Sequence, residues 1–200
     1  MKTLVIVLVI TLATPRDEPP VLVHRLVVQP SSTLSIEGTT NINRYKCAIS
    51  RYAGSDTLVL NEGGRNIRPV FVKGAVALDA SSFDCGLALM TSDFHKAIKS
   101  KDYPAIIVDF ISFERMPAYT SAPERFKGIL KISLGGVTKL FEVNCAIEAT
   151  DSGIIHLTGS RGFVFSDFSL TPPTRMLGIV KVREALNVSF HLQLTLDPNS

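Results

Sequence analysis

The sequence predicts an all-β protein: a single extended antiparallel β-barrel of about eight strands with one or two short helices. Apolar and polar residues alternate with period two through most of the chain, as half-buried strands require. Turn residues such as 61–64 (NEGG) and 135–136 (GG) separate these segments. With 200 residues, 46% of them hydrophobic, the chain can form one domain with a substantial core. A long antiparallel sheet must cover its edges, and closure into a barrel does so.

The N-terminal segment has the pattern of an export signal. Lys2 is followed by an apolar run over residues 4–13 (LVIVLVITLA), which ends before Pro15 and charged residues. A membrane-spanning helix needs about 20 apolar residues, so the run has instead the length of a signal-peptide core. We expect a signal peptide over residues 1–18, a barrel domain over 19–200, and a periplasmic or secreted protein. The alternative is a buried N-terminal strand.

Eight or nine strands are expected, each bounded by turn residues. The clearest is 186–196, in which six apolar residues alternate with polar ones. Gly74 interrupts another at a point where a closed sheet often bends or bulges. In chain order the predicted strands are 21–28, 34–38 with its continuation 45–49, 58–60, 70–78, 106–110, 126–134, 141–147, 155–165 and 186–196.

One segment has helical rather than strand spacing. Over residues 91–101 (TSDFHKAIKSK), Phe94, Ala97 and Ile98 fall on one face. Thr91 or Ser92 is expected as the N-cap, with acidic Asp93 in the first turn and lysines at the end. The sequence therefore predicts a short amphipathic helix that ends before Pro104. A second short helical or irregular piece is expected over 166–174.

The charge balance argues against a nucleic-acid partner. Twenty-one basic and 18 acidic residues give a net charge of only +3, and the chain has no Trp. Neither a basic surface nor many aromatic stacking platforms are therefore expected.

Catalytic and metal-binding motifs are not found in the sequence. His24, His95, His156 and His191 belong to separate predicted elements, and we expect solvated surface histidines. The chain has no HExxH motif, no GxSxG motif and no phosphate-binding glycine loop. The sequence thus predicts neither an enzyme nor a metal site.

A small basic run, Lys96, Lys99 and Lys101, lies on the predicted helix. It has two interpretations. The lysines form a solvated face that complements the helix dipole, or they rim a barrel mouth and meet an anionic head group.

Three cysteines, Cys47, Cys85 and Cys145, allow at most one intramolecular disulfide. In an exported protein we favour Cys47 with Cys85. The alternative is that all three are small buried apolar residues.

The inward faces of the strands are mainly Leu, Ile, Val and Phe, so the lumen is either an apolar cavity or a solid core. Each inward residue contacts a ligand or simply packs in the core. The predicted ligand-lining residues are Ile106, Val108, Phe110, Leu130, Ile132, Phe141, Val143, Val188, Phe190 and Leu192.

Four segments resemble YceI-like domains of bacterial envelopes. Residues 34–47 (LSIEGTTNINRYKC) are similar to the entry strand of that family, and 83–110 to its helix, Tyr-Pro and following strand. Residues 126–143 (FKGILKISLGGVTKLFEV) resemble its Gly-Val-Thr-Lys hairpin, and 166–182 the region before its last strand. The resemblance implies an extended lipocalin-like barrel, usually periplasmic, that holds a long isoprenoid or other lipid tail.

Together these observations predict carriage of a long-chain apolar ligand, such as an isoprenoid quinone, polyprenyl or fatty lipid, without catalysis. The expected partner is that hydrophobic small molecule, and no cofactor is expected apart from a bound isoprenoid lipid. Transient membrane contact and a homodimer are compatible with this interpretation. The alternative is a solid-cored envelope module that acts through protein or glycan contacts.

Overall fold

The fold is all-β, with one short α-helix. The computed structural model describes residues 22–49, 51–63, 67–175 and 179–197. The predicted signal peptide over 1–18 lies outside the described residues. The strands are β1 (Val23–Val28), β2 (Thr33–Thr40), β3 (Arg44–Ile49), β4 (Thr57–Asn61), β5 (Val70–Lys73), β6 (Ala75–Asp79), β7 (Ala105–Phe113), β8 (Glu124–Leu134), β9 (Val137–Ala149), β10 (Ile154–Val164), β11 (Thr174–Arg175) and β12 (Val180–Leu196).

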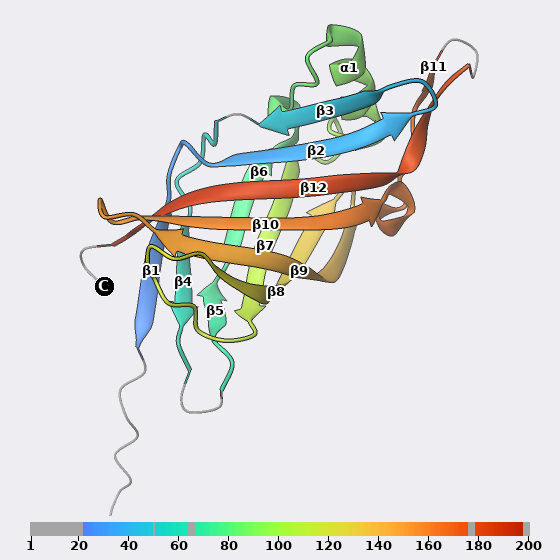
Figure 1. The fold of residues 1–200 in the computed structure, drawn as a ribbon. Coiled ribbons are helices and arrows are strands. Elements are labelled where there is room, and N and C mark those ends of the chain that lie inside the picture. The colour runs from blue at the N-terminus through green and yellow to red at the C-terminus, as the bar shows by residue number, and fades with distance from the viewer. Residues whose placement is uncertain (1–21, 50, 64–66, 176–178, 198–200) are drawn as a thin grey trace, which may run out of the picture.

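Eight of these strands form a closed antiparallel ring, as the sequence predicts. The order is β1-β4-β5-β7-β8-β9-β10-β12, and β12 pairs with β1 to close it. Leu26 lies opposite Leu196 at this closure. In Figure 1, β1, β4 and β5 run across the direction of β10 and β12, and the core lies between these two groups.

The long strand β12 organises the barrel. It has 17 residues, longer than predicted, and its pairing with β10 runs from Ala185 to Thr195. Its other edge is shared, because Val182 to His191 pair with β2 and Leu194 to Leu196 pair with β1. Strands β2 and β3 therefore form a hairpin that extends from the barrel wall.

The structure has more strands than the eight or nine expected, partly because the predicted strand 70–78 is divided at Gly74. The residues before it form β5 and those after it form β6, and both pair with β7. The Phe110 amide donates to the Gly74 carbonyl oxygen at 2.9 Å. A Cβ atom at Gly74 would overlap the Phe110 carbonyl oxygen, so this close approach requires glycine.

The helix is present, but the predicted bounds and cap were wrong. Helix α1 spans Ala88–Ala97, with Leu87 at the N-cap and no side-chain cap. Thr91 is inside the helix, where its hydroxyl accepts from the Cys85 amide at 3.0 Å and donates to Asp84 at 3.1 Å. Asp93 is therefore not in the first turn. Phe94 is buried on the predicted face, and Ile98 is buried just after the helix ends.

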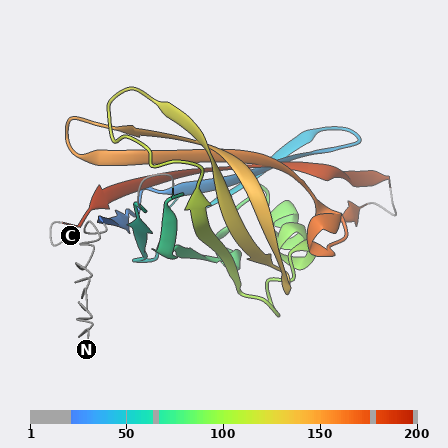
Figure 2. The ribbon, with the colours of Figure 1, turned by 90° about the horizontal axis from the view of Figure 1, so that it is seen from below.

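The helical or irregular piece expected over 166–174 is present, with 3-10 structure in its first part and irregular chain up to residue 173. A 3-10 turn, η2, spans Phe165–Phe168, and strand β11 follows at Thr174–Arg175. A further 3-10 turn, η1, spans Ala80–Ser82. Figure 2 shows α1 and η2 together at one end of the barrel.

Cys47 and Cys85 form a disulfide, the pairing favoured from the sequence. Cys145 is a free, buried thiol, and burial raises its pKa to about 12. The thiol therefore stays protonated, and Cys145 serves as a core residue. Among the described residues, no helix is long and apolar enough to cross a membrane.

Candidate functional site

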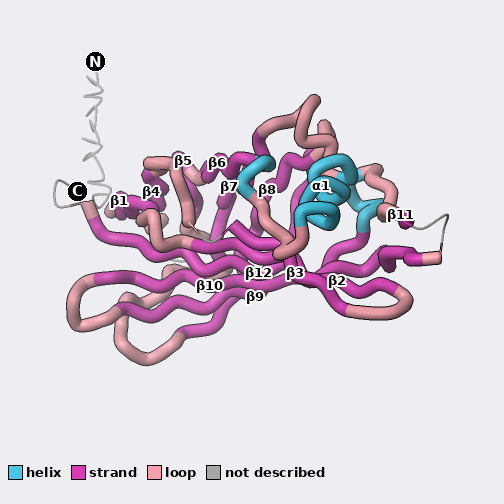
Figure 3. Tube along the Cα trace, turned by 90° about the horizontal axis from the view of Figure 1, so that it is seen from above, coloured by secondary structure: helices cyan, strands magenta, loops and turns pink. Residues whose placement is uncertain are grey.

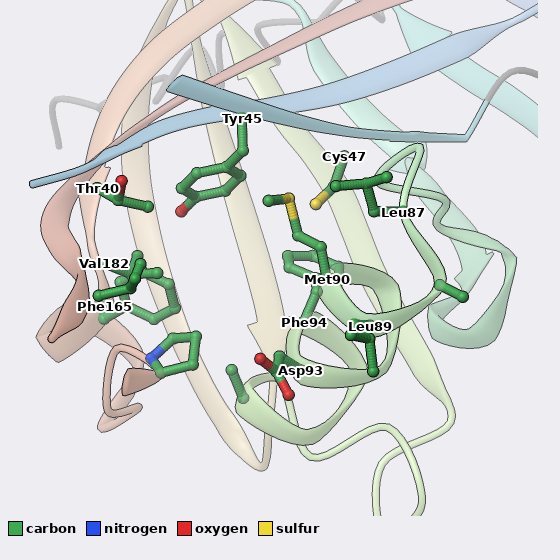
Figure 4. A pocket seen from close by; sticks show the side chains of 14 residues that line it. Thr40, Tyr45, Cys47, Leu87, Leu89, Met90, Asp93, Phe94, Phe165 and Val182 are labelled. Atoms are coloured by element: carbon green, nitrogen blue, oxygen red, sulfur yellow. The ribbon is translucent and has the colours of Figure 1, made fainter. Parts of the chain in front are cut away.

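An apolar cavity opens at the end of the barrel where α1 lies (Figure 4). We call it the mouth cavity; its volume is about 370 Å³, within the usual range for ligand pockets. It lies between the β2–β3 hairpin, α1 and the start of β12. Its lining is Thr40, Tyr45, Cys47, Leu87, Ala88, Leu89, Met90, Asp93, Phe94, Ala97, Phe165, Pro173, Val180 and Val182.

Strand alternation and the disulfide position this lining. On β3, Tyr45 and Cys47 point inward from alternate positions, as Val180 and Val182 do on β12. The Cys47–Cys85 disulfide joins β3 to the segment that leads into α1, and so holds the helix against the hairpin. The hairpin and the helix therefore keep a defined spacing.

The polar groups in the mouth cavity other than Asp93 are neutral or engaged locally. The Thr40 hydroxyl donates to the Asn43 side-chain oxygen at 2.6 Å. Burial raises the pKa of the Tyr45 phenol to about 12, so this group is uncharged at neutral pH. Asp93 is the acidic residue of the lining. This environment favours an apolar occupant.

A second, smaller cavity lies deeper in the barrel. We call it the central cavity; its volume is about 80 Å³. It shares Phe94 and Phe165 with the mouth cavity, so these two rings separate the two spaces. Its remaining lining is apolar: Leu34, Ile36, Leu78, Phe83, Ile98, Ile106, Val108, Ile132, Leu134, Phe163, Phe168, Leu170, Leu186 and Val188.

A third space, the inner cavity, has a volume of about 30 Å³. Leu34, Leu78 and Val108 line both it and the central cavity. Phe190 closes one side, and its ring meets Phe110 edge to face with centroids 5.8 Å apart. The three cavities thus follow one another from the mouth into the barrel, separated only by apolar side chains.

Most of the predicted ligand-lining residues lie along this path. Ile106, Val108 and Ile132 face the central cavity with Val188, while Phe110, Phe190 and Leu192 face the inner one. Leu130, Phe141 and Val143 are buried but line none of these three cavities. Phe141 instead packs against Phe163 with ring centroids 4.9 Å apart.

The mouth cavity itself was missed in the sequence. Its lining comes largely from α1, the 3-10 turn η2 and the β2–β3 hairpin, which do not share a strand period with the barrel. One signal was available: Leu87, Leu89 and Met90 form an apolar cluster just before the predicted helix.

Two histidines expected to be solvated surface residues of separate elements are half-buried and in contact with each other. His156 on β10 and His191 on β12 share a hydrogen bond of 2.8 Å between Nδ1 and Nε2. Burial and the neighbouring His156 lower the pKa of His191, while Glu148 acts in the opposite direction. His24 approaches Glu62 at 3.4 Å and His95 the Phe83 carbonyl oxygen at 3.0 Å. The described residues contain no cluster of three metal-ligating side chains.

The basic run lies at and just after the end of α1, and none of its lysines lines the mouth cavity. Lys96, Lys99 and Lys101 border a separate surface hollow, together with Asp84 and Asp102. Direct contact between these lysines and the head group of a ligand in the mouth cavity is therefore not favoured.

Comparison by sequence finds nothing similar: no protein-family model and no curated protein matches the chain. Comparison of structures, in contrast, finds proteins with a similar fold. A polyisoprenoid binding domain from Saccharophagus degradans, implicated in plant cell wall breakdown, superposes with a TM-score of 0.62 at 10% identity. The match covers 86% of this chain and 98% of that one.

Two further structures have a similar fold. BcnA from Burkholderia cenocepacia has a TM-score of 0.58 at 15% identity, covering 81% of this chain and 95% of that one. The Campylobacter jejuni YCEI protein has a TM-score of 0.50 at 16% identity, covering 64% and 73%. This chain therefore has the fold of YceI-like barrels, as the sequence resemblance implied.

Proposed function

We propose that this protein binds a long-chain apolar ligand in the mouth cavity and the barrel interior, as a carrier without catalysis. One observation carries the proposal: three apolar cavities follow one another from the mouth inward and share lining residues. The ligand class we favour is a polyisoprenoid or similar lipid tail. The similarity in fold to the polyisoprenoid binding domain of Saccharophagus degradans supports that class.

Burial of an apolar tail supplies favourable free energy for such binding. Each methylene removed from water contributes about 0.8 kcal/mol, and a tail of many carbons adds such terms along the cavity. The mouth cavity alone is large enough for part of a tail. The central and inner cavities are small, so deeper entry requires side chains such as Phe94 and Phe165 to rotate.

Export to the periplasm or outside the cell is proposed together with this function. The apolar run over residues 4–13 and the disulfide support it, because structural disulfides persist in oxidising compartments.

The competing proposal is a solid-cored envelope module that acts through protein or glycan contacts. The small volumes of the central and inner cavities are the observation that favours it. It predicts an empty protein at every stage of purification.

Mass spectrometry of organic extracts from mildly purified protein tests the function. We expect an isoprenoid or fatty species near one molecule per chain. Delipidated protein should then take up a polyprenol supplied in detergent. A protein that is empty after purification and takes up no polyprenol would refute the carrier proposal.

A further inference from the structure

The mouth cavity is bordered by large apolar side chains that face water. Leu87 and Leu89, at the start of α1, are 65% and 68% exposed. Ile42, in the β2–β3 turn, is 69% exposed, and Ile179, just before β12, is 66% exposed. We call these four residues the apolar rim. They come from three chain segments that also supply the lining of the mouth cavity.

The chain segments that carry the two isoleucines are joined by hydrogen bonds of Asn41. The Asn41 side chain donates to the Ile179 carbonyl oxygen at 2.8 Å and accepts from the Lys181 amide at 2.9 Å. The Asn41 amide also donates to the Lys181 carbonyl oxygen at 3.1 Å. The turn that carries Ile42 is thus tied to the chain beside Ile179.

The third segment is fixed by the disulfide. Leu87 follows Cys85 by two residues, and Cys85 is bonded to Cys47 on β3. Figure 3 shows α1, β11 and the β2–β3 hairpin at the same end of the barrel, away from the C-terminus. The apolar rim is therefore a preformed feature of the cavity entrance.

Positive charges accompany the rim. Arg44, Lys181 and Arg183 are exposed on the two strands that leave these turns, and none of the three forms a salt bridge with another described residue. Lys46, by contrast, pairs with Glu37 at 3.3 Å. Apolar side chains at projecting turns with these cations behind them suit a lipid surface, because the former enter the acyl boundary and the latter meet anionic head groups.

We infer that the apolar rim docks on an anionic lipid bilayer and opens the mouth cavity to it. The purpose of this contact rests on the proposed function, since a water-insoluble tail would pass directly between bilayer and cavity. The binding itself is independent of any cargo. A flat protein partner fits less well, because the four side chains project from turns and a helix start instead of forming a sheet face.

Vesicle flotation with delipidated protein tests the inference. We expect the protein to float with vesicles that contain phosphatidylglycerol, to float less with pure phosphatidylcholine, and to be released by high salt. In Ile42→Ser/Ile179→Ser, the fraction bound should fall at least tenfold. These two residues do not line the mouth cavity, so uptake of detergent-solubilised polyprenol should be unchanged.

Val72→Ser/Leu140→Ser is the matched control, because Val72 and Leu140 are 71% and 63% exposed on β5 and β9 and neither belongs to the rim or lines the mouth cavity. It should float as the wild type does. If the wild type fails to float, or if both double variants float equally well, the docking inference is wrong even when polyprenol uptake is intact. Flotation without uptake would instead overturn the proposed function and leave the docking surface standing.

Discussion

Cys47 and Cys85 form a disulfide that joins the β2–β3 hairpin to the segment in front of α1. Cys47 also lines the mouth cavity, and Leu87, two residues after Cys85, lies on its rim. The disulfide therefore lies at the entrance of the mouth cavity and fixes part of it.

Loss of this disulfide should loosen the entrance and destabilise the protein. In Cys85→Ser we expect the free energy of unfolding to fall by about 2–4 kcal/mol, since the unfolded chain loses its cross-link. Denaturant titration with and without reductant measures this. Reductant should lower the midpoint of the wild type and of Cys145→Ser, but not that of Cys85→Ser. An unchanged wild-type midpoint in reductant would contradict the pairing.

Filling the mouth cavity should block the ligand without harming the fold. Ala97 lines the cavity, and in Ala97→Phe the ring enters empty space. We expect polyprenol affinity to fall at least tenfold, while stability changes by no more than about 1 kcal/mol because the core is not overpacked. Ala77→Phe, at an exposed position of β6, should bind as the wild type does. Equal affinity in both variants would place the ligand elsewhere.

A charge in the inner cavity tests how deeply a tail reaches. Phe190 lines that cavity, and in Phe190→Asp an unpaired carboxylate faces an apolar space, which disfavours a tail by several kcal/mol. We expect polyprenol binding to be lost. Leu140→Asp, at an exposed position, is the control. Circular dichroism must show that Phe190→Asp is folded, and retained binding by the folded variant would restrict the ligand to the mouth and central cavities.

Acid should destabilise the protein through His191. Because burial and His156 lower the pKa of His191 in the folded state, the unfolded chain, with a pKa of about 6.5, binds the proton first as the pH falls. Stability should therefore decrease on acidification below about pH 6.5. In addition, two protonated rings could not share the His156–His191 hydrogen bond.

Thermal unfolding between pH 7.5 and 5 measures this effect. His191→Gln should reduce the slope of stability against pH over that range. Val72→Ser, at an exposed position of β5 and without a titratable group, should keep the wild-type slope. Identical slopes in the wild type and His191→Gln would show that the pair does not govern the acid response.

Gly74 should not tolerate a side chain. In Gly74→Ala the new methyl overlaps the Phe110 carbonyl oxygen, and we expect a loss of about 1–3 kcal/mol from the strain. Gly162→Ala is the matched control on β10, because the nearest atom to a Cβ there is the Leu186 carbonyl oxygen at 3.9 Å. Denaturant midpoints compare the two. Equal midpoints would mean that the sheet adjusts at Gly74 without cost.

Strand faces could be predicted from the sequence because alternation is a local property of the backbone. Phe141, Val143, Cys145 and Ile147 were expected on one face of one strand, and all four are buried on β9. The helical face of Phe94 and the special position of Gly74 were likewise readable from neighbouring residues.

Contacts between segments that are far apart in the sequence were decided only by the tertiary structure. The register of β10 against β12 places His156 beside His191, 35 residues apart, and no local pattern specifies that register. The mouth cavity depends in the same way on three segments that meet around one disulfide. Alternation determined which side chains turn inward. Whether they enclose space depends on how the helix, the hairpin and β12 pack, because cavity volume is a property of the packed assembly and not of any one strand.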